Sequence, residues 1–336
     1  MRITGWGSAL PHKTVTNDDL AERLDTSDAW ISERTGIRER RIGGTTSGLA
    51  TEAGDAALRS AGVDRAAVDM VIVATCTPDQ TMPATASTVQ HDLGVGGAAF
   101  DLNAVCSGFV YGLVVGAGLL ATGLDQVLLI GSDTMSRIVD WDDRSTAILF
   151  ADGAGAVVIE ATEAPGDLLG YDLDNDGSGR HLLSADIAGF IKMDGREVFR
   201  RAVRSTVESA QRSLERAGIG IDDVTLMVPH QANIRIIDAA CRGLGLPIER
   251  AVITVDRHGN TSAASIPLAL ADAADGGRVM PGDLVLLVGF GAGMSVASAV
   301  VRWNIATSDH EPSGDVLLAT TGPGQPVHHF RPEGQL

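Results

Sequence analysis

The sequence has few lysines, few aromatic residues, few cysteines and no long uninterrupted apolar segment. Only two of its 26 basic residues are lysines, Lys13 and Lys192, against 43 acidic residues, so the formal net charge is −17. A surface this acidic repels a phosphate backbone, which disfavours binding to nucleic acid. Aromatic residues make up 4% of the chain and there are 40 glycines, so we expect an aliphatic core in which backbones approach closely at glycines.

The cysteines and the apolar runs set expectations for the compartment. Cys76, Cys106 and Cys241 form no CxxC pair and are odd in number, so we expect free thiols and a cytoplasmic location. The amino-terminal residues contain no apolar stretch typical of a signal peptide. The longest apolar run, 109–121, is too short to span a bilayer and contains three glycines, so no membrane span is expected.

Two parts of the 336-residue chain share one order of elements. The first contains VDMVIVATC, DLNAVCSGFVYG and VLLIG, and the second contains VTLMVPHQAN, DRHGNTSAAS and VLLVG. Continuous apolar strands that alternate with helices indicate parallel sheets covered on both faces. We therefore predict an α/β protein of two duplicated halves, 1–160 and 161–303. A tail at 304–336, with four prolines and no periodicity, is expected to be mobile.

Local patterns refine this outline. Residues 27–36 indicate a capped helix, and 196–218 indicate a long amphipathic helix. Residues 161–190 are rich in turn formers and predict a loop or ribbon. The segment AVITVD at 251–256 predicts a strand that ends before Asn260, in the same way that a strand ends before Cys106.

Cys106 is the candidate nucleophile. It lies where an apolar strand gives way to a helix of small residues. A thiol in this position is exposed to the partial positive charge and the free N–H groups of the helix N-terminus, which favour the thiolate. The alternative is an inert buried cysteine. Cys76 and Cys241 are expected to be structural.

His230 and Asn260 lie at comparable junctions. His230 ends a strand in MVPHQAN, and Asn260 precedes a helix in DRHGNTSAAS. Sites in α/β proteins gather at the carboxyl ends of strands, so we expect both side chains to converge on Cys106. A Cys–His pair can carry out nucleophilic acyl transfer. The glycine-rich segment GFGAG at 289–293 offers backbone N–H groups to an oxyanion.

Metal and nucleotide sites are not predicted. Asp172, Asp174 and Asp176 match the start of an EF-hand loop, but Leu183 stands where that loop requires a glutamate. The histidines do not follow the HExxH spacing, and the sequence has no GxxxxGK[ST] motif. We therefore expect no metal ion and no other cofactor.

Four longer motifs together resemble a known family. VCSGFVYG, VPHQANIRII, DRHGNTSAASIPLAL and GFGAGMS, in this order, resemble β-ketoacyl-acyl carrier protein synthase III of the thiolase superfamily, and the resemblance extends over residues 1 to about 303. It implies a thiolase-like five-layered αβαβα fold and a homodimer. It also implies an acyltransferase that condenses a primer acyl-CoA with malonyl-acyl carrier protein through an acyl-Cys intermediate. This decarboxylative Claisen condensation initiates fatty acid or polyketide synthesis, with both thioesters as substrates rather than cofactors.

The resemblance also assigns roles. Cys106 resembles the acyl-accepting nucleophile, and His230 and Asn260 resemble the pair that binds the malonyl thioester carbonyl. The backbone N–H groups of Cys106 and Ala292 are expected to form the oxyanion hole. In the CoA site, Trp30 and Arg144 match residues that sandwich the adenine, and Arg34 matches a pyrophosphate contact. The expected acyl pocket consists of Met82, Met135, Phe150, Ile191 and Phe290.

Two departures from the family concern primer and partner. Met82 stands where a phenylalanine of the partner subunit caps the acyl pocket, and a flexible methionine there predicts longer or branched primers. The chain and acyl carrier proteins are both acidic, so docking needs a local basic patch. The candidates, which could equally be ordinary solvated residues, are Arg200, Arg201, Arg204, Arg235 and Arg242.

Other functions are weaker candidates. A synthase III-like acyltransferase that moves an acyl group to a small-molecule acceptor, in natural-product biosynthesis, is the main alternative. A thiolase proper would carry a second cysteine where this chain reads GFGAGM. A non-catalytic partner subunit is disfavoured because Cys106, His230 and Asn260 are all present.

Overall fold

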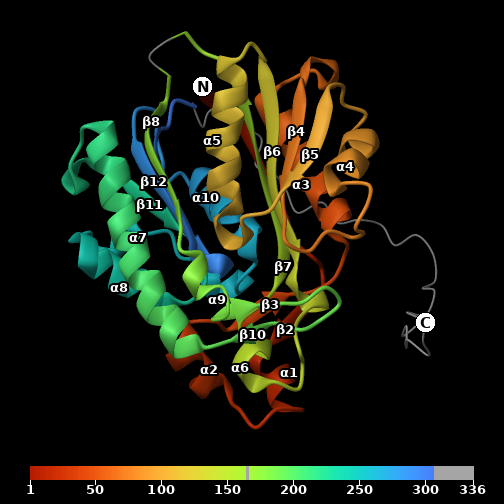
Figure 1. Cartoon of the computed structure of the whole chain (residues 1–336), viewed down its shortest axis with the longest axis vertical. Coiled ribbons are helices and arrows are strands. Elements are labelled where there is room, and N and C mark those ends of the chain that lie inside the picture. The colour runs from red at the N-terminus through yellow and green to blue at the C-terminus, as the bar shows by residue number, and fades with distance from the viewer. Residues whose placement is uncertain (164–165, 306–336) are drawn as a thin grey trace.

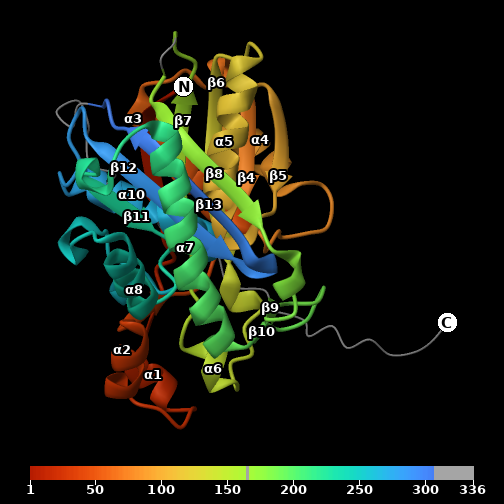
Figure 2. The ribbon, with the colours of Figure 1, turned by 60° about the vertical axis from the view of Figure 1, so that its left-hand side comes forward.

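Two β-sheets with helices between them and on their outer faces form the frame of the chain (Figure 1). The computed structural model describes residues 1–163 and 166–305. Helices α3 (Thr46–Ala61) and α4 (Thr85–Leu93) cover the first sheet, and α7 (Gly195–Ala217) and α8 (Ile234–Leu244) cover the second. Helices α5 (Gly108–Ala121) and α10 (Ser265–Asp275) lie between the sheets (Figure 2). The result is the five-layered αβαβα fold that was predicted.

Four strands of the first sheet recur in the second with the same order and directions, and the first sheet has β5 in addition. The first runs β5 (Ala98–Leu102), β4 (Met70–Ala74), β6 (Gln126–Thr134), β7 (Asp152–Glu160), β1 (Arg2–Ala9). The second runs β11 (Leu226–Pro229), β12 (Leu284–Gly291), β13 (Ser295–Arg302), β8 (Leu168–Asn175). In each, a parallel pair (β4–β6, β11–β12) is followed by two antiparallel pairings. This repeat is the duplication that the sequence indicated.

One predicted strand is absent from the described residues. The segment 251–256 makes only an isolated bridge, between Ala251 and Met227, and continues into the short helix α9 (Val255–His258). The reason is that the Gln231 side chain replaces a neighbouring strand: its Oε1 accepts the N–H groups of Thr254 and Val255 at 2.9 and 3.1 Å. The prediction of a strand that ends before Asn260 is therefore wrong.

The prediction of a loop over 161–190 is also wrong in part. Residues Leu168–Asn175 form β8, the edge strand of the second sheet, while the short strands β9 (Leu183–Ser184) and β10 (Lys192–Met193) pair with each other. The strand pattern was obscured because an acidic side chain takes a buried position. Asp172 is 2% exposed, and Arg212 and Arg216 hold its carboxylate at 2.7 and 3.2 Å.

The apolar run at 109–121 forms the buried helix α5. Its glycines let it lie directly on the first sheet, since a Cβ at Gly112 or Gly116 would be 2.5 Å from Leu129 or 2.7 Å from Ile159. Within the described residues, no helix has the length and apolar character needed to cross a membrane. The tail predicted at 304–336 lies, from 306 onward, outside the described residues.

A group of short elements closes the end of the molecule below the sheets in Figure 1. The helix expected at 27–36 is present as α2, capped by Ser27, with Gly36 at φ 80° as its C-cap. The group comprises β2 (Thr14–Thr16), α1 (Asn17–Ala21), α2 (Asp28–Thr35), β3 (Glu39–Arg41) and α6 (Arg144–Ala147).

Candidate active site

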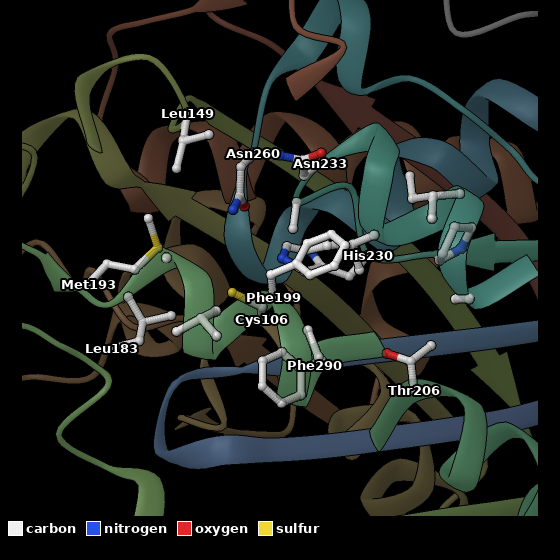
Figure 3. Close-up of a pocket in the computed structure, with 18 of the residues that line it drawn as sticks. Cys106, Leu149, Leu183, Met193, Phe199, Thr206, His230, Asn233, Asn260 and Phe290 are labelled. Atoms are coloured by element: carbon white, nitrogen blue, oxygen red, sulfur yellow. The ribbon is translucent and has the colours of Figure 1, made fainter. Parts of the chain in front are cut away.

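Cys106, His230 and Asn260 line one cavity of about 180 Å³, so the structure brings the three residues together (Figure 3). They come from separate parts of the fold. Cys106 lies between β5 and α5, His230 follows β11, and Asn260 follows α9. The nucleophile candidate therefore comes from the first half, and its two partners come from the second.

A strained turn presents Cys106. The Asn103 side chain accepts the N–H of Val105 at 3.1 Å, and Val105 has φ 50°, a value that is costly for a β-branched residue. Residues Val105–Ser107 then form one 3₁₀ turn that leads into α5. Such a conformation persists only where its surroundings fix it, and here β12 packs against the turn at Gly289 and Gly291.

The glycines of β12 leave room for the backbone of Cys106. A Cβ on Gly291 would be 2.8 Å from the Cys106 nitrogen, so any side chain there would cover that N–H. The turn Ala292–Met294 begins directly after Gly291. The first N–H groups of a helical turn have no acceptor within the turn, so the N–H groups of Cys106 and Ala292 are available to a substrate oxygen. Of the predicted glycine loop, Gly289–Gly291 belongs to β12.

The thiol of Cys106 is neutral in the resting site. Burial raises its pKa to about 12, and the hydroxyl of Ser262, 3.5 Å from Sγ, lowers the pKa by a smaller amount. The expectation of a resting thiolate is therefore wrong, because desolvation of the charged form outweighs the helix N-terminus.

His230 is neutral as well, and its environment selects one tautomer. Burial lowers its pKa to about 3. Its Nδ1 lies 2.6 Å from Ser265 Oγ, which also accepts the N–H of Gln231 at 3.3 Å. The hydroxyl proton of Ser265 is therefore free to be donated to Nδ1, which places the ring proton on Nε2. The imidazole is thus a hydrogen-bond donor toward the cavity.

Asn260 is oriented as a second donor. Its Oδ1 accepts the N–H of Ser262 at 2.9 Å, and its backbone is fixed on both sides by Leu149 and Ala151. The amide nitrogen remains for the cavity (Figure 3). Two neutral N–H donors beside a thiol can stabilise negative charge that develops on a bound oxygen.

Sequence reasoning missed the residues that support this geometry. Ser262, with φ 51°, places its hydroxyl 3.5 Å from the sulfur of Cys106 and 3.6 Å from that of Cys76. Cys76 was expected to be merely structural but lies beside the site, where burial raises its pKa well above the usual value. Cys241 is buried in the apolar layer beneath α8, as expected.

Asp133 is a second missed residue, although its position after VLLIG marked a strand end. Its carboxylate is fully buried and accepts hydrogen bonds from Thr75, Cys76, Thr77 and the N–H of Ala263, at 2.8–3.1 Å. It thereby joins the loop after β4 to the turn that carries Ser262.

The three residues predicted for CoA form one stack. The guanidinium groups of Arg34 and Arg144 lie 4.3 and 4.6 Å from the centre of the Trp30 ring. Arg144 lies directly against the indole, so an aromatic base could enter between these two side chains only after they move apart.

The predicted acyl pocket is only partly found in this chain. Phe150 and Phe290 line the cavity, whereas Met135 and Ile191 are buried in the core without reaching it. Met135 instead contacts Cys76, with 3.9 Å between the sulfurs. Met82 is 79% exposed and does not line the cavity. Its expected role involves a partner subunit.

The five candidate docking arginines of α7 and α8 differ in their partners. Of the five, four are paired with carboxylates: Arg200 with Glu197, Arg201 with Glu197 and Asp176, Arg204 with Glu208, and Arg242 with Asp238. Arg235 has no ion pair within the described part of the chain and lies 5.9 Å from the Phe199 ring. Arg242 lies about two turns beyond Arg235. Among these five arginines, Arg235 is the one without an ion pair to the described residues, and the docking patch itself stays a prediction.

Among residues 1–163 and 166–305, no group of three or more His, Cys, Asp or Glu side chains is arranged to hold a metal ion. The acidic residues that match the start of an EF-hand loop are paired with side chains of the same chain. Asp172 and Asp174 bind Arg212, and Asp176 binds Ser178 and Arg201.

Comparisons with known proteins agree with this arrangement. Residues 100–177 match the family model for 3-oxoacyl-[acyl-carrier-protein (ACP)] synthase III, and residues 214–303 match the model for the C-terminal part of these proteins. The chain is 51% identical over 317 residues to the β-ketoacyl-[acyl-carrier-protein] synthase III of Erythrobacter litoralis and 47% identical over 322 residues to that of Roseiflexus castenholzii. Each alignment covers 90% of this chain and 98% of the relative.

Solved structures lead to the same family. The 3-oxoacyl-[acyl-carrier-protein] synthase III of Aquifex aeolicus superposes with a TM-score of 0.88 at 44% identity, covering 90% of this chain and 99% of the other. The enzyme of Pseudomonas aeruginosa gives a TM-score of 0.88 at 46% identity, with 90% and 98% covered. A priming β-ketosynthase of the R1128 polyketide pathway gives 0.86 at 37% identity, with 90% and 96% covered.

Proposed function

The chain belongs to the 3-oxoacyl-[acyl-carrier-protein] synthase III family, and we propose that it condenses a primer acyl-CoA with malonyl-acyl carrier protein. It is an acyltransferase of the condensing type, and the relatives support this function rather than transfer to a small-molecule acceptor. The observation that carries the mechanism is the convergence of a buried neutral thiol with two neutral N–H donors in one cavity.

In the first step, the sulfur of Cys106 attacks the carbonyl carbon of the primer thioester. The negative charge that develops on the carbonyl oxygen is stabilised by the N–H groups of Cys106 and Ala292. The carbon–sulfur bond to CoA then breaks. The thiol proton, which a pKa near 12 retains until attack, ends on the departing CoA sulfur. The products are an acyl thioester on Cys106 and free CoA.

In the second step, the malonyl thioester binds with its carbonyl oxygen between Nε2–H of His230 and the amide nitrogen of Asn260. Loss of CO2 leaves an enolate, whose negative oxygen these two donors stabilise. The enolate carbon attacks the acyl carbon on Cys106, and the bond to sulfur breaks. A proton from solvent restores the thiol, and the product is a β-ketoacyl thioester. The reaction as proposed needs no metal ion or other cofactor.

The substrates are proposed to approach from the end where Trp30, Arg34 and Arg144 gather. A CoA adenine placed between Trp30 and Arg144 would replace their mutual stacking, so binding would be coupled to a movement of Arg144. For the carrier protein, Arg235 is the proposed contact: it lies beside Phe199, which lines the cavity, and no carboxylate of the described residues pairs with it. We also propose that the enzyme acts in the cytoplasm as a homodimer, in which Met82 of one subunit reaches the acyl pocket of the other.

Mass spectrometry tests the first step. Wild-type enzyme incubated with a primer acyl-CoA should gain one acyl group, located on the peptide that contains Cys106, and addition of malonyl-acyl carrier protein should remove it. The Cys106→Ser variant should gain no thioester-bound acyl group. Equal labelling of the variant would show that Cys106 is not the acceptor.

A further inference from the structure

The cavity at Cys106 continues into a space between α7 and α8. On α7, Phe199, Ala202 and Thr206 are three and four residues apart and therefore lie on one face of the helix. Pro229 and Val288, which are paired in the register of β11 and β12, form the floor. We name this part of the cavity the α7–α8 slot and define it by Ala202, Thr206, Pro229, Ile237, Ala240 and Val288.

Small side chains open the slot, and close helix packing ends it. Ala202 on α7 and Ala240 on α8 fill little of the space between the helices. Directly after Thr206 on α7, and three residues beyond Ala240 on α8, the helices touch, since a Cβ on Gly243 would lie 2.8 Å from a methyl carbon of Val207. From the level of Phe199 to that of Thr206 is seven residues, or roughly 10 Å along the helix.

Thr206 is a polar residue at the far end of this otherwise apolar slot. It is 6% exposed, and its hydroxyl has no hydrogen-bond partner among the described residues. Thr35 and Ser213 are helical hydroxyls that do have one, on the carbonyls of Ile31 at 2.7 Å and Ala210 at 2.9 Å, whereas those of Thr51 and Thr85 lack one but do not line the cavity. Figure 3 shows the oxygen of Thr206 on the side that faces Phe290. The oxygen of Thr206 is accessible from the cavity rather than fully buried, so a ligand atom there can accept its proton.

Building on the proposed function, we infer that the α7–α8 slot binds the acyl chain of a medium-length primer thioester and that Thr206 donates a hydrogen bond to an oxygen near the far end of that chain. The slot is continuous with the Cys106 cavity, so a chain bound there remains attached to the reacting carbonyl. Roughly 10 Å corresponds to about eight bonds of an extended chain, at about 1.2 Å for each bond. The substrate class is an acyl-CoA of medium length with a distal hydroxyl or keto group, for which octanoyl-CoA and ω-hydroxyoctanoyl-CoA serve as probes.

The first experiment tests the slot by filling it from either helix. The variants Thr206→Leu and Ala240→Leu are compared with wild type for the rate at which octanoyl-CoA and acetyl-CoA acylate Cys106. Added carbons that overlap the chain should lower the octanoyl-to-acetyl ratio by about tenfold or more in both variants. Ser205→Leu, a half-buried residue of α7 outside the cavity, is the matched control and should keep the wild-type ratio.

The outcomes separate the two claims. A wild-type ratio in both slot variants would overturn the inference while leaving the proposed function intact. If neither thioester acylates Cys106 of the wild-type enzyme, the proposed function itself fails. Two variants on different helices guard against one of them simply misfolding.

The second experiment tests the hydroxyl. Wild type should acylate faster with ω-hydroxyoctanoyl-CoA than with octanoyl-CoA, and Thr206→Val, which has the same shape without the hydroxyl, should lose about 3- to 10-fold of that preference. Thr206→Ser, which restores the hydroxyl, should regain it. If Thr206→Val keeps the wild-type preference for ω-hydroxyoctanoyl-CoA, or if the wild-type enzyme has no such preference, Thr206 does not bind the distal oxygen of the acyl chain.

Discussion

The two halves of the molecule build the same turn before their central helix and use it differently. In the first half, Asn103 accepts the N–H of Val105, whose φ is 50°, and α5 follows. In the second half, Asn260 accepts the N–H of Ser262, whose φ is 51°, and α10 follows. Cys106 therefore corresponds to Ala263, not to Asn260 as the sequence suggested. In the first half the candidate nucleophile, Cys106, directly follows the strained Val105. In the second half the candidate donor, Asn260, precedes the strained Ser262.

The strands that pack against the two turns, β6 against the second and β12 against the first, differ at one aligned position. VLLIG and VLLVG align Asp133 of β6 with Gly291 of β12. The Asp133 carboxylate accepts the N–H of Ala263 at 3.0 Å, whereas Gly291 has no side chain to bind the equivalent N–H, that of Cys106. The duplicated scaffold thus caps this N–H in one half and leaves it open in the other. A candidate oxyanion site results from the absence of one side chain.

The largest expected effect on acylation comes from a substitution that covers the open N–H of Cys106. Gly291→Ala places a Cβ 2.8 Å from the Cys106 nitrogen, and loss of one oxyanion donor typically lowers rates by about 10²–10³. We therefore expect acylation by acyl-CoA to fall by that factor, measured as the rate of acyl-enzyme formation.

Gly118→Ala is the matched control for this substitution. Gly118 lies in α5, and a Cβ there has no neighbour within 4 Å, so acylation should keep its wild-type rate. Thermal unfolding of both variants separates loss of fold from loss of the donor. A folded Gly291→Ala enzyme with the wild-type acylation rate would show that the Cys106 N–H has no part in the reaction.

The second effect concerns the ionisation of Cys106. Because burial raises its pKa to about 12, alkylation by iodoacetamide should rise about tenfold per pH unit from pH 7 to 10, without a plateau. Ser262→Ala should slow alkylation further at each pH, since the serine hydroxyl lowers the pKa of the thiol. A plateau near neutral pH would mean that the resting site holds a thiolate.

The smallest effect concerns the carrier protein. Arg235→Gln should raise the KM for malonyl-acyl carrier protein several-fold at low salt, and the increase should shrink at high salt as charges are screened. Arg204→Gln should have a smaller effect than Arg235→Gln, because Glu208, at 2.8 Å, competes with the carrier protein for direct contact with Arg204. Equal effects of the two variants would contradict the proposal that Arg235 is the carrier contact.

The sequence was informative where function and fold depend on local patterns. The strand-to-helix junctions of Cys106 and Asn260 and the VLLIG/VLLVG repeat were enough to predict two halves and a shared site. The strand β8 was missed because a salt-bridged Asp172 occupies a buried position, which breaks the apolar alternation. The charge state of Cys106 was predicted in the wrong direction because burial depends on the whole fold.

Residues that act through tertiary packing were not predictable. Thr206 resembles any polar residue of an amphipathic helix until α8 is placed opposite it, and Cys76 is distant from Cys106 in sequence although both contact Ser262. The ion pairs of the α7 arginines, with carboxylates of the same helix or of the turn at Asp176, were not predicted. Such partners appear only once side-chain geometry is known.

The central claim is that the first half accepts the acyl group and the second half decarboxylates the malonyl group. The most direct test measures both partial reactions, acyl-enzyme by intact mass and CO2 release from malonyl-acyl carrier protein, in Cys106→Ala and His230→Ala. The account predicts opposite patterns: Cys106→Ala forms no acyl-enzyme but still releases CO2, whereas His230→Ala forms acyl-enzyme and releases CO2 about 10²–10³ more slowly than wild type. Loss of both partial reactions in each folded variant, or wild-type CO2 release by His230→Ala, would contradict it.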